Sequence, residues 1–150
     1  MIRRYTPADR VGLGAMYRDF EPKRCAQGLP PEAGARLERW LDRVLCQGLH
    51  LVVEVDGRIQ GHAMLIPIGD ETAELANFLH QAVRGRGIGT AMNRAAVALA
   101  RDAGFRRIWL SVEPSNRPAI RSYGKVGFRR LAGSLWAPEI EMEVVLDGAS

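Results

Sequence analysis

Three alternating glycines just past the middle of the chain constrain its fold more than any other feature. The stretch Val83-Arg84-Gly85-Arg86-Gly87-Ile88-Gly89-Thr90 follows an apolar run, Ala73 to Leu79, and leads directly into a helical pattern from Ile88 to Ala103. Glycines at such a junction leave backbone N–H groups uncovered by side chains. With the positive end of a helix dipole behind them, these N–H groups predict an anion site suited to a pyrophosphate. Arg84 and Arg86 flank the glycines and can neutralise the same charge.

The loop fits neither of two common phosphate-binding motifs. A P-loop ends in Gly-Lys-Ser/Thr, whereas Gly89 is followed by Thr90 without a lysine. A Rossmann fingerprint reads G-x-G-x-x-G at the first strand of a domain, whereas these glycines alternate at every second position. A structural interpretation stays open at this point, because glycine also serves tight turns that require a positive φ.

Composition narrows the class of protein. A chain of 150 residues, with 47% hydrophobic and 25% charged residues, has the size and composition of one soluble domain, residues 1–150. The net charge is +4 and the cations are nearly all scattered arginines, which favours phosphate-bearing or acidic ligands over nucleic acid. Cys25 and Cys46 form no CxxC motif, and no apolar run reaches the roughly eighteen residues of a membrane span. We therefore expect a cytoplasmic protein with reduced thiols, no metal site, and no nucleic-acid or membrane partner.

Hydrophobic periodicity predicts an α/β fold with a mixed sheet, in the order β-α-α-β-β-β-α-β-α-β-β. The expected strands are Met1 to Tyr5 at an edge, Leu51 to Val55, Ile59 to Ile68, Thr72 to Leu79, Arg107 to Val112, Phe128 to Leu131 and Glu139 to Leu146. The expected helices begin at Thr6-Pro7, Pro30-Pro31-Glu32, Ile88 and Ser115, and the second, third and fourth end at Gly48, Gly104 and Gly127.

Local signals support several of these boundaries. Asp56-Gly57 is the strongest short signal for a β-hairpin, and Gly69-Asp70-Glu71 indicates the next turn. Thr6 is the expected N-cap of the first helix, with Pro7 at its first helical position. Ser115 is the expected N-cap of the last helix.

A second motif lies in the last third of the chain. Its residues read N-x-x-A-I-x-x-Y-x-x-x-G-F, from Asn116 through Tyr123 to Phe128. This motif resembles the second signature of the GNAT superfamily of N-acetyltransferases. The glycine loop, read as R-x-x-G-x-G from Arg84 to Gly89, resembles the acetyl-coenzyme A loop of the same family. The resemblance covers about Leu75 to Leu131, whereas residues 1–48, where acceptor-binding elements usually lie in this family, match no motif.

The resemblance implies a single-domain fold with a mixed, mostly antiparallel sheet flanked by helices. The sheet should be splayed between the strand before the glycine loop and the strand after its helix. The pantetheine arm would pair with the backbone of Asn77, Phe78 and Leu79, as an added strand does. The pyrophosphate would lie on the N–H groups of the loop, beside Arg84. These N–H groups belong to Gly85, Arg86, Gly87, Ile88, Gly89 and Thr90.

Two residues of the second motif correspond to family positions with a role. Asn116 corresponds to an asparagine that contacts the cofactor arm, although it can also cap the helix that follows. Tyr123 corresponds to the tyrosine that protonates the departing coenzyme A thiolate, since a phenol keeps its proton at neutral pH. A packing role for Tyr123 is the alternative, because it lies three residues after Ile120 on one helix face.

The implied reaction is acetyl transfer from acetyl-coenzyme A to a primary amine of a small molecule or peptide, by direct attack in a ternary complex. Ser111 stands where several members have a catalytic glutamate, so Glu74, Glu113 and His80, acting through water, remain candidate bases and none is assigned. His80 is expected at the surface. The alternatives are a non-catalytic acyl-coenzyme A sensor and transfer of a longer acyl group, for which Pro67 and Trp136 would matter.

The acceptor and the assembly stay open at this stage. Glu139, Glu141 and Glu143 alternate along the last strand and could select a cationic acceptor, although a solvated strand face explains them more simply. A homodimer is the one assembly considered.

Overall fold

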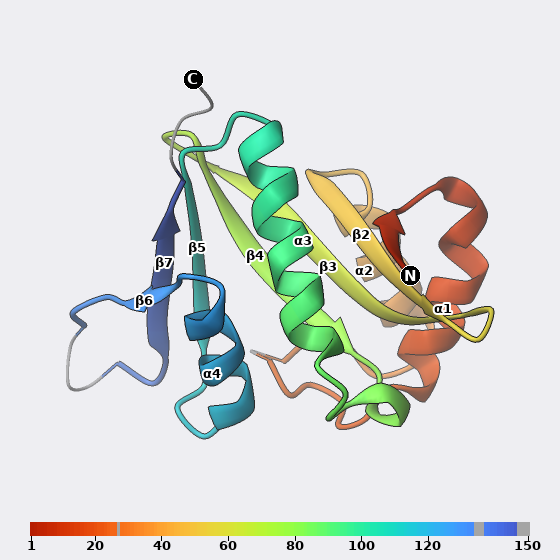
Figure 1. Ribbon diagram of the computed structural model, residues 1–150. Helices are drawn as coiled ribbons and strands as arrows, with labels where there is room; N and C mark the ends of the chain where they lie inside the picture. Colours follow the sequence, from red (N-terminus) through yellow and green to blue (C-terminus); the bar gives the residue numbers. More distant parts are fainter. Residues whose placement is uncertain (27, 134–136, 147–150) are drawn as a thin grey trace.

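One seven-stranded sheet runs through the molecule and carries helices on both faces (Figure 1). The structure is a computed structural model that describes residues 1–26, 28–133 and 137–146. The strands are β1 (Ile2–Arg4), β2 (Leu49–Val55), β3 (Arg58–Gly69), β4 (Thr72–Leu79), β5 (Arg107–Val112), β6 (Arg129–Arg130) and β7 (Ile140–Val145). The α-helices are α1 (Arg10–Asp19), α2 (Ala35–Val44), α3 (Ile88–Asp102) and α4 (Arg117–Lys125), and the 3₁₀-helices are η1 (Pro7–Asp9) and η2 (Gln81–Val83).

The sheet has the strand order β1-β2-β3-β4-β5-β7-β6, and only β4 and β5 pair in parallel. The predicted hairpin joins β2 to β3, and both turn residues have positive φ, 51° at Asp56 and 75° at Gly57. A type I′ turn requires positive φ at both positions, which explains why Asp-Gly forms it. The element order and the mostly antiparallel mixed sheet agree with the sequence prediction.

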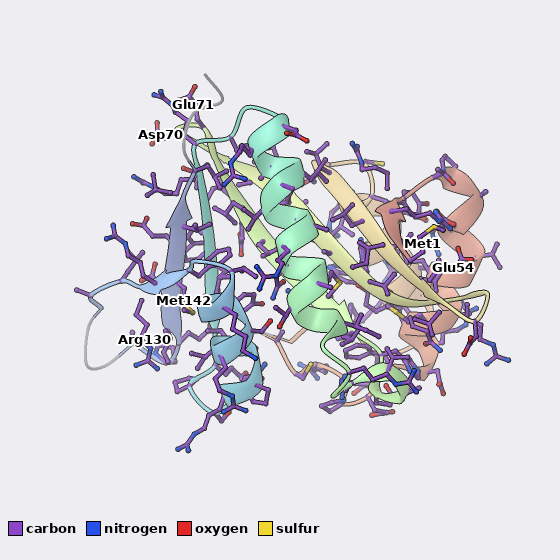
Figure 2. All side chains as sticks on the ribbon, viewed as in Figure 1. Met1, Glu54, Asp70, Glu71, Arg130 and Met142 are labelled. Carbon is purple, nitrogen blue, oxygen red and sulfur yellow. The ribbon has the colours of Figure 1, made fainter. Side chains whose placement is uncertain are left out.

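The predicted splay is present between β4 and β5. The two strands pair only from Thr72 to Glu74 of β4 and from Arg107 to Trp109 of β5, although both continue beyond these pairs. Asp70 and Glu71, at the turn before β4, mark the closed end of this arrangement, and the strands diverge toward α4 (Figures 1 and 2). We call the diverging segments, residues 75–79 and 110–112, the splay. Backbone groups facing the splay lack a neighbouring strand.

Two hydrophobic cores lie on the two faces of the sheet. On the face covered by α3 and α4, buried residues such as Leu75, Met92 and Ile108 pack together. On the other face, α1 and α2 bury an aromatic cluster that includes Tyr17, Trp40 and Phe78. Figure 1 shows α3 and α4 in front of the sheet, with α2 behind it. Successive residues of a strand therefore contribute to different cores.

Three sequence predictions differ from the structure in detail. Helix α2 begins at Ala35 rather than at Pro30, because its N-cap Gly34 has φ 99° and ψ −154°, a conformation that interrupts the helix. The N-cap of α4 is Asn116 rather than Ser115. His80 is buried rather than at the surface, with 6% of its area exposed. The other predicted boundaries agree to within a few residues.

Two candidate features are not found in the part of the chain that the structure describes. None of its helices is long and apolar enough to cross a membrane. No group of three or more His, Cys, Asp or Glu side chains there is arranged to hold a metal ion. Trp136 lies outside the described residues.

Candidate active site

The glycine loop leaves room for a ligand directly above its backbone. Gly85 and Gly87 have φ values of 80° and 78°, and a Cβ atom added at either would meet no atom within 4 Å. Gly87 is also the N-cap of α3. In the described part of the chain, no acceptor takes the backbone N–H groups of residues 85 to 90. Six consecutive N–H groups at a helix N-terminus are the type of arrangement that can bind an anion, and the contact with a pyrophosphate stays a prediction.

The two arginines of the loop differ in how firmly they are held. Arg84 donates from Nε to the backbone oxygen of Leu79 over 2.8 Å. Its guanidinium carbon also lies 5.2 Å from the ring centroid of Phe20. Arg86 is exposed. Arg84 is therefore anchored to the last residue of β4. Its two terminal nitrogens can still donate hydrogen bonds to an anion.

The edge of β4 presents backbone groups to the splay. The N–H of His80 donates to Gln60 in β3 over 2.8 Å, so the alternation of a strand turns the backbone of Leu79 and Asn77 the opposite way. These two residues therefore offer the groups that an added strand would use. Phe78 directs its backbone to β3, where it pairs with His62, and its side chain lies in the aromatic core.

Tyr123 is buried beside the splay. It lies on α4 with 7% of its area exposed, and its ring centroid is 5.5 Å from that of Phe128. Burial raises the pKa of the Tyr123 phenol to about 12, and a hydrogen bond with the Asn77 side chain opposes this rise. The phenol is therefore protonated at neutral pH, and Asn77 offsets part of the cost of forming a phenolate.

A chain of polar side chains connects the elements around Tyr123. Asn77 on β4 donates to Asn93 on α3, and Asn93 donates to Ser122 Oγ over 3.0 Å. Ser122 Oγ also lies 3.0 Å from Thr90 Oγ1, at the start of α3. We call Asn77, Asn93, Ser122 and Thr90 the splay chain. It joins β4, α3 and α4 next to the tyrosine.

Sequence reasoning missed Asn93 and Ser122. Asn93 is buried, with 2% of its area exposed, next to the apolar face of α3. A polar residue beside that face was the signal that could have found it, because buried amides need hydrogen-bond partners.

Asn116 has the capping role that the sequence allowed. Its side-chain oxygen accepts a hydrogen bond from the N–H of Ala119 over 3.3 Å. The bond fixes the start of α4 and thereby the position of Tyr123, two turns along.

The three candidate bases occupy different environments. His80 uses both ring nitrogens, since Nδ1 accepts from the N–H of Ala82 over 3.0 Å and Nε2 lies 2.8 Å from Asp19. Glu113 is exposed beyond the end of β5. Glu74 belongs to the last residue pair before the splay and is half-buried. Burial, and secondarily the charge of Glu139, raise the pKa of the Glu74 carboxyl.

A second chain of polar side chains lies in the aromatic core on the other face of the sheet. Tyr17 Oη is 2.7 Å from His62 Nδ1, and His62 Nε2 is 2.9 Å from His50 Nδ1. His50 Nε2 is 2.7 Å from the backbone oxygen of Gln47. We call Tyr17, His62 and His50, with this carbonyl, the histidine chain. The sequence did not predict it.

The comparisons with known proteins identify the family. The family model of the GNAT acetyltransferases matches residues 14–128. This chain belongs to the GNAT acetyltransferase family.

Similar sequences and structures agree with this assignment. An uncharacterised N-acetyltransferase of Mycobacterium tuberculosis is 40% identical over 80 residues, which are 53% of this chain and 51% of that protein. The GNAT domain of S. lividans PAT has a similar fold, with a TM-score of 0.82, 21% identity, and 97% and 89% of the two chains covered. A Sinorhizobium meliloti phosphinothricin acetyltransferase, solved with acetyl-coenzyme A, gives a TM-score of 0.78 at 18% identity, with 97% and 88% covered. The chain spans about half the length of the mycobacterial relative.

Proposed function

We propose that this protein transfers an acetyl group from acetyl-coenzyme A to a primary amine, by direct attack within a ternary complex. The observation that carries the proposal is the run of backbone N–H groups without acceptors at residues 85 to 90, next to the edge of β4 that faces the splay. The loop can hold a pyrophosphate, and Asn77 and Leu79 can pair with the amides of an extended arm. Asn116 lies at the start of α4, where it can contact the same arm.

The residues around the splay suit the chemistry of acyl transfer. Acetyl-coenzyme A supplies an acyl group activated as a thioester. The acceptor amine first gives one proton to a base, and its nitrogen then attacks the carbonyl carbon. The carbon–sulfur bond breaks, and Tyr123 gives its phenolic proton to the departing sulfur. The new amide nitrogen releases its second proton to water. The splay chain holds α4 against β4 during this step. The phenolate that remains takes a proton from solvent after the products leave.

Glu74 is the candidate base that the geometry favours. An amine is mostly protonated at neutral pH and must lose a proton before it attacks. A half-buried carboxyl with a raised pKa is a better proton acceptor than an exposed one. Glu74 has these properties, whereas His80 is fully hydrogen-bonded and Glu113 is exposed.

The cofactor site can be tested with a matched pair of glycine variants. Gly87→Val should abolish binding of coenzyme A, because the new side chain occupies the open space above the loop. Gly104→Val is the control, since Gly104 also has positive φ and open space but lies at the other end of α3. Both changes force a branched residue into a strained conformation, at a similar cost in stability. Isothermal titration should show binding to the Gly104 variant only, and equal binding to both would refute the placement.

Turnover distinguishes the enzyme from a sensor domain. Acetyl-coenzyme A and a panel of primary amines should release free thiol faster than acetyl-coenzyme A alone. Rates that stay at the no-acceptor level across the panel, with cofactor binding confirmed, would favour the sensor.

A further inference from the structure

An arginine-lined cavity lies apart from the glycine loop. It has a volume of about 520 Å³ and lies between α2 and the segment 24–33. Its charged and aromatic lining residues are Arg24, Arg36, Arg39, Arg43, Glu32 and Trp40. Four arginines against one glutamate give this lining a net charge of +3. We call this cavity the arginine pocket.

The arginines of the pocket lack acidic partners. No carboxylate in the described ranges forms an ion pair with Arg24, Arg36, Arg39 or Arg43. The neighbouring face of α2 is different, because Glu38 and Asp42 there pair with Arg10 of α1. The two acidic residues of α2 thus bind α1 rather than the arginines of the pocket.

The spacing of the arginines directs their charges to one place. Arg36, Arg39 and Arg43 follow one another at three- and four-residue steps, so they share one face of α2. Like charges at such spacing destabilise a helix slightly. An oxyanion would relieve the repulsion and match the planar, two-pronged guanidinium groups.

The fourth arginine is held by an unusual backbone. Arg24 has φ 57°, in the left-handed region that residues with a side chain rarely adopt. Its N–H donates to Pro30 over 3.0 Å, and Ala26 and Leu29 exchange two further backbone hydrogen bonds. The segment therefore folds back on itself and keeps Arg24 opposite α2. Strain of this kind persists where the surrounding structure imposes it.

The pocket segment starts next to the proposed active site. The N–H of Glu21 donates to Gln81 of η2 over 2.9 Å, directly after β4. Burial raises the pKa of the Cys25 thiol, and the charges of Arg84 and Glu113 act on it in opposite directions. The hydrogen bond between Glu21 and Gln81 therefore places the chain that leads into the segment beside η2, which precedes the glycine loop.

The acidic strand is less suited to select the acceptor. Glu143 pairs with Arg107 at 3.3 Å and with Arg129 at 3.4 Å, and Glu141 accepts from the Trp109 indole over 2.8 Å. Glu143 is therefore buried and ion-paired rather than part of a solvated strand face, and neither glutamate is left to select an acceptor. Among the described residues, those of the arginine pocket combine a concave shape with positive charge that no ion pair compensates.

We propose that the arginine pocket binds an oxyanion group of the acceptor, so that the preferred substrates are small amines that also carry a phosphate or a carboxylate. The inference rests on the proposed acetyl transfer for the amine end of the ligand. The pocket volume is within the range for small-molecule sites, about 300–1,000 Å³.

The binding test uses protein saturated with coenzyme A, so that the pyrophosphate site is filled. O-phosphoserine is the probe, and its binding is measured by calorimetry. Serine, which lacks the phosphate on the side chain, is the comparison ligand. The double variant Arg36→Gln/Arg43→Gln should bind O-phosphoserine at least about tenfold more weakly, because it removes two charge-assisted contacts to the phosphate.

The control variant is Arg94→Gln/Arg101→Gln. These exposed arginines have the same seven-residue spacing on α3, on the other face of the sheet, so the net charge changes equally. The control should keep wild-type affinity for O-phosphoserine. Equal losses in both variants, or no loss in either, would overturn the pocket.

A kinetic test separates this inference from the proposed transfer reaction. The pocket variant should raise KM for acceptors that carry a phosphate or a carboxylate and leave kcat within a few-fold. KM for an uncharged analogue, such as an amino-acid amide, should stay unchanged, and an equal rise for both would contradict the pocket. If the wild-type protein shows no turnover but the pocket variant still loses O-phosphoserine binding, the pocket stands and the proposed transfer reaction is refuted.

Discussion

Two buried chains of polar side chains lie on opposite faces of the sheet, and they differ in whether their members titrate. The splay chain consists of amides and hydroxyls and ends next to Tyr123, where two strands separate. The histidine chain contains two imidazoles and a phenol within an aromatic core. Burial lowers the pKa of His62 to about 3 and also lowers that of His50. The first chain keeps its charge state at every ordinary pH, whereas the second can change it.

The hydrogen bonds of the histidine chain run in one direction. The Gln47 carbonyl can only accept, so His50 Nε2 carries a proton. Neutral His50 then accepts at Nδ1 from His62 Nε2, and neutral His62 accepts at Nδ1 from the Tyr17 hydroxyl. Each ring nitrogen of the two histidines and the Tyr17 hydroxyl group has a hydrogen-bond partner. The comparison indicates that the histidine chain belongs to the packed core, whereas the splay chain lies next to the proposed general acid.

The largest expected effect comes from removing the hydroxyl beside the splay chain. Tyr123→Phe should lower kcat roughly 10²- to 10⁴-fold, the usual range for a general acid, or about 2.7–5.5 kcal/mol of transition-state stabilisation. Affinity for coenzyme A should change little, because the ring and its packing remain. The measurement is kcat beside the melting temperature. A lower melting temperature with turnover kept within a few-fold would make Tyr123 a packing residue.

The histidine chain predicts a loss of stability in acid. His62 has a folded pKa of about 3 against 6.5 for an ordinary histidine, so below pH 6.5 the unfolded chain binds a proton that the folded chain does not. This contribution is complete above pH 6.5 and declines as the pH falls toward the folded value. The free energy of unfolding should therefore fall by up to about 1.4 kcal/mol per pH unit from this residue.

Urea unfolding between pH 5 and 7.5 measures this dependence. His62→Gln is the matched variant, because a glutamine amide can bond to both neighbours but does not titrate. Its slope should be shallower than the wild-type slope by close to one proton. Parallel slopes for the two proteins would mean that His62 does not couple folding to pH.

The smallest expected effect comes from breaking the splay chain without touching Tyr123. Asn93→Leu removes the link between Asn77 and Ser122 and should lower kcat about tenfold, the order of one lost buried hydrogen bond. KM for acetyl-coenzyme A should change little. Val97→Ala is the control, since Val97 is buried one turn further along α3 and outside the chain.

The two variants separate positioning from stability. Both should lower the melting temperature, but only Asn93→Leu should reduce kcat. An equal fall of kcat in both variants would assign the splay chain to stability alone.

Local signals were sufficient for much of the fold. Asp56-Gly57 forms the hairpin because its backbone preference needs no distant residue. Gly85 and Gly87 adopt positive φ where the alternation suggested a bare backbone. The start of α2 was mistaken because prolines also occur before a helix that begins later, and Gly34 sets that boundary. The surface position predicted for His80 was wrong, because its surroundings include residues distant in the sequence, such as its hydrogen-bond partner Asp19.

The sequence by itself determined the elements that local chemistry dictates: the hairpin, the glycine loop, and the helix that carries Tyr123. Only the tertiary structure decided which side chains meet. Tyr17 and His62 are 45 residues apart, and Asn93 and Ser122 are 29 apart. Arg24 reaches the arginines of α2 only because its segment folds back. Backbone propensity and turn chemistry act over a few residues, whereas contacts of this kind require the packed sheet that brings distant segments together.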